Sequence, residues 1–434
     1  MNLNEKISKL AASFEEKTVI RRRDLHRHPE AGWTEFRTAS FVIETLAGLG
    51  YEVNFGNDVI SEKDMMGVPD EKTLAKHMQR AIAQGANPAL VEKMSGGKTG
   101  VVGIMKFSKP GPTVALRFDM DCNEVTESAD PKHRPAAEGF ASVNKGCMHA
   151  CGHDGHTSAG LTIAEILVNL KDELAGTVKF IFQPAEEGVR GAKAMMCKGI
   201  VDDVDFLLAA HLMKPKVGYV AYDVRGFLAT SKFDAEFTGV PAHAGAAPET
   251  GKNSLLAAAT AALNIHAISR HSDGTSRINV GVLNAGSGRN VIASSAVLKI
   301  ETRGVTSSVN EYIYNCAEKI IKNSAAMYDN TVTITQMGGA VGGNNSPALV
   351  DLIGETVKQI GIFDEIGTVS DPGGSEDCSY FMERVQQNGG QAAYLIIGAD
   401  ITTVNHHLFF DFDETALTRE TQLLATLACE LLTK

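Results

Sequence analysis

The stretch MHACGHDGHT, residues 148–157, places three histidines and one cysteine within ten positions. A disulfide does not explain this density, because the stretch holds one cysteine and the neighbouring Cys147 lies too close in sequence to bridge to it easily. Thiolate and imidazole together suit zinc or another borderline divalent cation. Metal binding, proton transfer and coincidence are the interpretations that the stretch alone leaves open.

Further residues of metal-binding types lie at the carboxyl ends of expected strands or in the loops just after them. Open α/β sheets place their binding sites along that edge, so we expect these side chains to gather there. Carboxylates also admit manganese, and the set is large enough for a binuclear site. The residues concerned are Cys151, His153, Glu186, Glu187, His211, His406 and His407.

Each of these residues has an alternative interpretation, because a single histidine or cysteine more often packs in the interior than binds a metal. Coincidence at four strand ends is much less expected. His149 and His156 stay open between packing and orienting the ligands. The remaining cysteines have no such neighbours and are interpreted as packing residues: Cys122, Cys147, Cys197, Cys316, Cys378 and Cys429.

The adjacent carboxylates of Glu186 and Glu187 follow the apolar run FIFQPA, which leaves little room for a solvated face. If one carboxylate binds a metal and the other faces a metal-activated water, the second can take the proton of that water. It can later deliver the proton to a leaving amine. The pair therefore indicates hydrolysis of an amide.

Length and composition set the background for this site. A chain of 434 residues is long enough for two domains, and no stretch is apolar enough to cross a bilayer. Seven cysteines, an odd number, are typical of a reduced cytoplasmic protein. The net charge of −11 argues against a nucleic-acid surface. We therefore expect a soluble, cytoplasmic enzyme acting on a small molecule.

Short apolar strands alternate with amphipathic helices along most of the chain, which predicts an α/β fold with a mostly parallel sheet and helices on both faces. A helix is expected at 157–174, and residues 56–97 are interpreted as an additional helical insert. The expected strands include 99–107, 113–121, 176–187 and 205–212.

The segment from about 229 to 340 follows a different order, β-α-β-β-α-β, which is the ferredoxin-like arrangement. Because helices and a strand resume after it, we expect a small α+β domain inserted into a larger one. The expected boundaries are 1–228 for the first part of the catalytic domain, 229–340 for the insertion and 341–434 for the second part.

Several motifs in order resemble the binuclear metal amidohydrolases, a family that includes aminoacylases, N-acyl-amino-acid and hippurate hydrolases and plant auxin-conjugate hydrolases. The resemblance covers nearly the whole chain and implies a zinc-peptidase-like catalytic domain. The motifs are RRDLHRHPEAGWTEFRTA, RFDMD, MHACGHDGHT, FQPAEEG, AAH, AHAGAAPE, GGSEDCSYF and HHLFFDFDE.

The resemblance implies that two divalent ions, Mn²⁺ or Zn²⁺, are held by Cys151, His153, Glu187, His211 and His406, with Glu186 as the general base. In the family the last histidine stands seven residues before the aspartate of an Asp-Glu pair. Asp413 and Glu414 match that pair, which selects His406 and leaves His407 as the alternative. Asp119 and Asp121 of RFDMD are expected to orient ligands or to serve the fold alone.

For the inserted domain, the resemblance implies dimerisation, with His243 reaching the partner's site to stabilise the oxyanion. The partner would be an identical chain or a homologous one. Arg289 and Asn290 offer a donor fork and an amide suited to a substrate carboxylate, although an ordinary turn is the alternative. Gly374 and Ser375, in a run that starts with Gly373, could let the backbone approach the ligand; Glu376 is expected to support the site.

The expected activity is hydrolysis of an N-acyl amino acid, with p-aminobenzoyl-glutamate as the expected substrate and p-aminobenzoate and glutamate as products. A broader aminoacylase or an indole-acetyl-aspartate-type hydrolase is the alternative within enzymes. A non-catalytic regulatory subunit of a related hydrolase is the alternative outside them. An intact Glu186 beside a full ligand set argues for catalysis.

Overall fold

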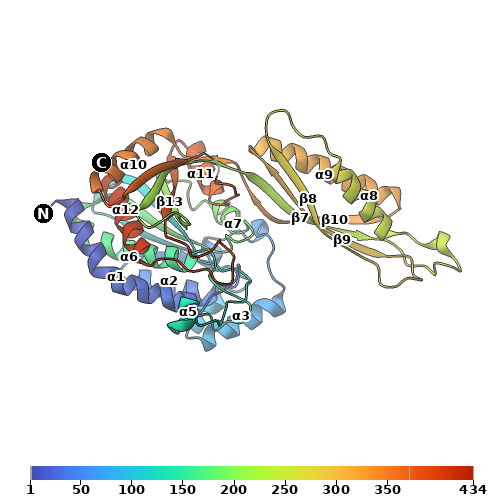
Figure 1. The fold of residues 1–434 in the computed structure, drawn as a ribbon, viewed down its shortest axis with the longest axis horizontal. Coiled ribbons are helices and arrows are strands. Elements are labelled where there is room, and N and C mark those ends of the chain that lie inside the picture. Colours follow the sequence, from blue (N-terminus) through green and yellow to red (C-terminus); the bar gives the residue numbers. More distant parts are fainter. Residues whose placement is uncertain (1, 371, 434) are drawn as a thin grey trace. The chain divides into compact units, whose positions relative to one another are not determined.

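The computed structural model describes residues 2–370 and 372–433. The chain divides into two compact units, which Figure 1 draws along the colour gradient of the sequence. The larger unit comprises Met1–Arg225, Asn344–Pro372 and Tyr380–Lys434, and the smaller one comprises Gly226–Gly343 and Gly373–Ser379. Among the helices of the described residues, none has the length and apolar character needed to cross a membrane.

The larger unit is built on a nine-stranded sheet within the described residues, in the order β1-β2-β4-β3-β5-β13-β6-β11, with β12 paired to β6. The pairs β3·β4, β3·β5, β5·β13 and β6·β12 are parallel, whereas β1·β2, β2·β4 and β6·β13 are antiparallel. The sheet is thus mixed. Its strands are β1 (Glu52–Phe55), β2 (Val101–Lys106), β3 (Lys109–Asp119), β4 (Ala175–Gln183), β5 (Phe206–Met213), β6 (Tyr219–Phe227), β11 (Gly343–Asn344), β12 (Glu365–Val369) and β13 (Gln391–Gly398).

The central strands of this sheet are buried almost throughout, as expected of strands covered on both faces by helices. Helix α6 is buried along most of its length because it lies between α1, α12 and β3. The helices are α1 (Leu3–Arg27), α2 (Phe36–Gly48), α3 (Glu71–Ala83), α4 (Pro88–Lys93), α5 (Arg134–Ala137), α6 (His153–Asn169), α7 (Ala192–Met196), α10 (Pro347–Ile360), α11 (Ser379–Gln387) and α12 (Thr415–Leu431).

Two element boundaries differ from those expected from sequence. Strand β4 ends at Gln183 rather than 187, because Pro184 has no N–H for the ladder and Ala185 has a positive φ of 51°. Helix α6 begins at His153 rather than 157, after Gly152 with φ 96°. Glu186 and Glu187 therefore lie in a turn, and His153 opens a helix.

The smaller unit is a four-stranded antiparallel sheet in the order β10-β7-β9-β8, with two helices packed on it. Its side chains alternate: Phe233, Ala235 and Phe237 of β7 are buried under the helices. The order β-α-β-β-α-β expected from the sequence is confirmed. The elements are β7 (Ala229–Thr238), α8 (Ser254–His266), β8 (Ser276–Ala285), β9 (Ser295–Gly304), α9 (Ser307–Met327) and β10 (Thr331–Ala340).

Candidate metal centre

The first group of candidate ligands lies where the start of α6 meets β5. Cys151 precedes the helix, His153 is its first residue and His211 lies near the end of β5. The Cys151 Sγ is 3.5 Å from the His211 Nε2, and ligand atoms of all three residues lie within 4.8 Å of one another. A buried thiol and two imidazoles at this spacing suit a borderline divalent cation.

Both histidines of this group present the nitrogen that a cation would need. The Nδ1–H of His153 donates to the Asp121 carbonyl (2.9 Å), and the Nδ1–H of His211 donates to the Leu212 carbonyl (2.7 Å). Each Nε2 therefore keeps its lone pair, and that of His153 is buried without a hydrogen-bond partner among the described residues. Burial and the nearby His156 lower the pKa of His211 to about 3, so that side chain is neutral, as a ligand must be.

A second group joins Cys151 to Glu187 and His406. The His406 Nε2 is 3.3 Å from the Glu187 Oε1, and the His406 backbone N–H donates to the Ala150 carbonyl (2.7 Å). Burial acts to raise the pKa of Glu187, but His406 and His153 lower it to about 2. Burial and Glu187 raise the pKa of Cys151 to about 12, so a cation that binds this thiolate must displace a proton.

The two adjacent histidines have different surroundings. His406 takes a positive φ of 66° and turns its ring toward Glu187. The Nδ1 of His407 instead accepts a hydrogen bond from the Phe409 N–H (3.1 Å). The structure therefore brings His406 into the group of candidate ligands and gives His407 a local role in its own loop.

The turn that carries Glu186 and Glu187 is held by one carboxylate. Asp121 accepts the Glu186 N–H at Oδ1 (3.1 Å) and the Glu187 N–H at Oδ2 (3.0 Å). The Glu186 Oε2 lies 3.9 Å from the His153 Nε2, so this carboxylate faces the first group without being one of its three members. A carboxylate beside a metal site, held through its own backbone, is placed to move a proton.

Glu35 supports the same turn, and sequence reasoning missed it. Its Oε1 accepts the Ala185 N–H (2.7 Å), and its Oε2 accepts the Thr99 hydroxyl (2.6 Å). Burial and the neighbouring Asp121 carboxylate raise the pKa of Glu35 above its usual range. The only available signal was its place in the motif that contains HPEAGWTEF.

The two undecided histidines are both buried, and neither stands in a ligand position. His156 uses both nitrogens: Nδ1–H donates to the Asp119 Oδ1 (2.6 Å), and Nε2 accepts the Leu212 N–H (3.0 Å). Asp119 also accepts from Arg117 (2.8 Å). His149 has no hydrogen-bond partner at either nitrogen within the described part of the chain, and burial lowers its pKa to about 3. It packs as a neutral ring.

The remaining candidate residues belong to the smaller unit. His243 forms a β-bridge with Val291, and the Ala244 N–H donates to the Asn290 carbonyl (3.0 Å), so His243, Arg289 and Asn290 lie together. The His243 Nδ1 accepts the N–H groups of Gly245 and Ala246 (both 3.1 Å), which leaves the proton on an exposed Nε2.

The glycine-serine run follows a different part of the smaller unit. The Gly374 carbonyl accepts the Leu228 N–H (3.1 Å), and the Ser375 Oγ is buried without a hydrogen-bond partner among the residues described. The carboxylate of Glu376 accepts the Cys378 N–H (2.9 Å) and shapes the same turn.

A buried carboxyl group on α12 adds a pH dependence to the fold. Glu420 is fully buried, and neither of its oxygens has a hydrogen-bond partner in residues 2–370 and 372–433. Burial raises the pKa of Glu420 to about 7, although the nearby His156 acts to lower it. The folded chain thus keeps a proton that the unfolded chain, with a carboxyl pKa of 4.5, releases.

Stability from this group is present below pH 4.5 and is lost as the pH rises toward 7. We therefore expect Glu420→Gln to gain stability over wild type as the pH rises from 5 to 8, by up to about 3 kcal/mol. Denaturant unfolding at both pH values measures the difference. Glu430→Gln, a partly exposed position on the same helix, is the control. A gain that does not change with pH would contradict the proton on Glu420.

Comparison with known proteins gives the family. The model of peptidase family M20/M25/M40 matches residues 115–430. Indole-3-acetyl-aspartic acid hydrolase of Enterobacter agglomerans is 48% identical over 409 residues, which are 94% of each chain. One of the p-aminobenzoyl-glutamate hydrolase subunits of Escherichia coli strain K12 is 46% identical over 426 residues, 98% of each chain.

A solved structure agrees with these relatives. The crystal structure of an aminobenzoyl-glutamate utilization protein from Klebsiella pneumoniae matches with a TM-score of 0.84 and 41% identity, covering 99% of this chain and 98% of that one. The expectation of a metal-dependent amidohydrolase is thereby confirmed. The chain belongs to peptidase family M20/M25/M40.

Proposed function

We propose that this amidohydrolase cleaves the amide of N-acyl amino acids with an acidic amino-acid half, and that p-aminobenzoyl-glutamate is its main substrate. The observation that carries the proposal is the Glu186 carboxylate next to two groups of ligand atoms that share Cys151. The name of the relative from Escherichia coli supports the aminobenzoyl-glutamate substrate. Indole-acetyl-aspartate is the second candidate, because the relative from Enterobacter agglomerans is comparably similar over nearly the same length.

The donor set fits two divalent cations, Mn²⁺ or Zn²⁺. One would lie among Cys151, His153 and His211, and the other among Cys151, Glu187 and His406. Such ions would polarise the scissile carbonyl and acidify the attacking water.

The protein's own groups perform the proton transfers. Glu186 takes the proton of the attacking water and delivers it to the leaving nitrogen, which completes the hydrolysis. Asp121 holds the backbone of this residue at 3.1 Å, so the carboxylate keeps its place during both transfers. Asp121 also fixes the His153 ring through its carbonyl, which couples base and ligand in one residue.

The smaller unit contributes the rest of the proposal. We infer that it mediates dimerisation, with an identical or a homologous chain, and that His243 acts in the partner's site. Its Nε2–H is free to donate to the carbonyl oxygen as negative charge develops there. Arg289 and Asn290 would bind the substrate carboxylate, and Gly374 and Ser375 would line the approach. The free cysteines fit a cytoplasmic location.

The substrate assignment is tested with the purified, metal-loaded chain. We expect kcat/KM for p-aminobenzoyl-glutamate to exceed that for hippurate, which lacks the acidic side chain. Indole-acetyl-aspartate is the third substrate of the panel, and a preference for it would favour the second candidate. No turnover of any of the three would contradict the proposed function.

Arg289→Ala should raise KM for acyl-glutamates roughly tenfold to hundredfold, because a charged hydrogen bond to the carboxylate is lost. An analogue with that carboxylate amidated should be much less affected. Arg277→Ala, at another exposed arginine of the same unit, is the matched control. Equal losses on both substrates would mean that Arg289 serves folding and does not bind the carboxylate.

A further inference from the structure

Helix α1 carries an arginine whose side chain is fully buried, although the helix supplies no candidate ligand. Each nitrogen of the Arg22 guanidinium donates to a different carboxylate. Nε donates to the Asp154 Oδ2 (2.8 Å), Nη2 to the Asp411 Oδ1 (3.0 Å) and Nη1 to the Glu414 Oε1 (3.1 Å). Side-chain exposure is 0% for both Arg22 and Asp154, so solvent does not weaken this contact.

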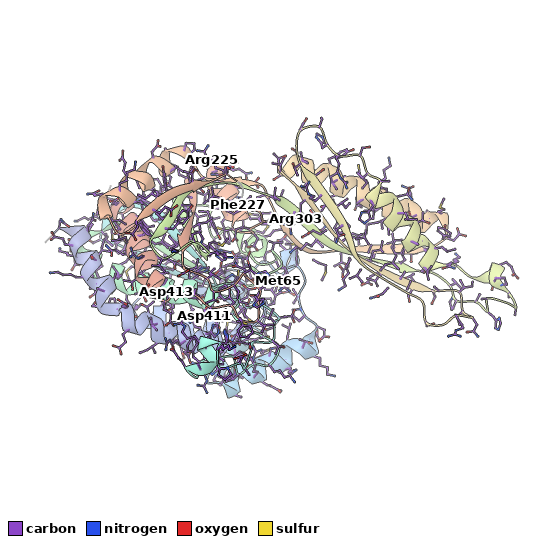
Figure 2. All side chains as sticks on the ribbon, viewed as in Figure 1. Met65, Arg225, Phe227, Arg303, Asp411 and Asp413 are labelled. Carbon is purple, nitrogen blue, oxygen red and sulfur yellow. The ribbon has the colours of Figure 1, made fainter. Side chains whose placement is uncertain are left out.

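The three carboxylates come from the two segments that carry candidate ligands. Asp154 directly follows His153 at the start of α6, within the segment that begins with Cys151. Asp411 and Glu414 follow His406 along the chain, and Figure 2 labels Asp411 in the larger unit. These segments also meet at the ligands themselves, where the His406 N–H donates to the Ala150 carbonyl (2.7 Å).

The neighbouring cations do not duplicate this connection. Arg23 donates to Glu414 (2.6 and 2.9 Å), and Arg134 donates to Asp411 and Glu414 (2.5 to 2.8 Å). Both bind the carboxylates that follow His406, whereas Asp154, on α6, takes its ion pairs from Arg22 and His26. His26 holds Asp154 from the other side (2.8 Å) and pairs with Glu127 instead of Asp411 or Glu414.

The chemistry of the guanidinium suits this place. A planar fork with donors in three directions can satisfy three carboxylates at once, whereas a lysine ammonium is a single point of charge. The ring of Phe412 lies 4.3 Å from the guanidinium carbon, which fixes its plane between the two segments. Rotation or loss of this group would leave buried carboxylates without their cation, so the two segments would separate or rearrange.

We propose that Arg22 is a positioning residue that holds the His153 segment and the His406 segment in register, so that the two groups of ligand atoms are formed before the ions arrive. The inference rests on the proposed metal-binding function. It gives the motif RRDLHRHPE, which supplies no ligand, a role at the metal centre through carboxylates that follow the ligands in sequence.

The test is metal affinity, measured by equilibrium dialysis against a series of free Mn²⁺ or Zn²⁺ concentrations with metal analysis of the protein. Arg22→Lys should bind its ions roughly 10- to 100-fold more weakly, the range for losing a group that orients ligands. Arg23→Lys and Arg134→Lys, which change the same carboxylate cluster without touching Asp154, should stay within about threefold of wild type. Melting temperatures with and without ions show whether each variant is folded.

A second variant covers the case in which Arg22→Lys does not fold. Asp154→Asn keeps Arg22 on Asp411 and Glu414 and breaks only the connection to α6, so it should show the same weakening. Combined with Arg22→Lys it should add little, because both changes break one connection. Wild-type affinity in folded Arg22→Lys or Asp154→Asn would overturn the inference alone. A wild-type chain that binds no ion would overturn the proposed function, and this inference with it.

Discussion

Glu186→Gln is expected to lower turnover of N-acyl amino acids by roughly 10²- to 10⁴-fold while the chain keeps its metal ions. The amide has nearly the shape of the carboxylate but cannot accept the proton of the attacking water. The backbone contact to Asp121 is unchanged, since it uses the Glu186 N–H. Steady-state kinetics and metal analysis on the same sample measure both quantities.

The neighbouring carboxylate is the matched control for this substitution. Glu187→Gln changes the same chemistry one residue along, but Glu187 stands in the group with Cys151 and His406. We expect Glu187→Gln to lose metal affinity as well as turnover. The assignment of Glu186 as the base would be wrong if a metal-replete Glu186→Gln chain turned over at nearly the wild-type rate.

The second large effect separates the two adjacent histidines. His406→Ala should weaken binding of one ion by about 100-fold or more, because the ring that approaches the Glu187 Oε1 at 3.3 Å is removed. His407→Ala should leave metal content unchanged, because its Nδ1 accepts the Phe409 N–H of its own loop and the ring serves that loop. Metal analysis after dialysis gives the comparison, and the reverse ranking would contradict the choice of His406.

The order of elements could be predicted because local patterns carry it. The run VKFIF is apolar enough for a buried strand, and the alternation in KFDAEF places Phe233, Ala235 and Phe237 on one face, as observed. The ends of elements were less predictable. Pro184 and the positive φ of Ala185 stop β4 early, and the backbone angles of a turn are set by its tertiary contacts, here with Glu35 and Asp121.

The gathering of the candidate ligands could also be anticipated, since the carboxyl ends of neighbouring parallel strands meet at one edge of a sheet. The supporting residues could not. Arg22 lies 132 residues from Asp154 and 389 from Asp411 along the chain, and nothing in the local sequence pairs them. Buried ion pairs of this kind depend on how helices pack, which periodicity does not encode.

The most direct test of the central claim is to measure metal content and amide hydrolysis on one sample of the wild-type chain, before chelation, after it, and after Mn²⁺ or Zn²⁺ is returned. We expect two ions per chain, loss of hydrolysis when they are removed, and recovery of both together. Unchanged hydrolysis by a chain stripped of its ions would contradict the account, and so would a fully loaded chain that cleaves no N-acyl amino acid.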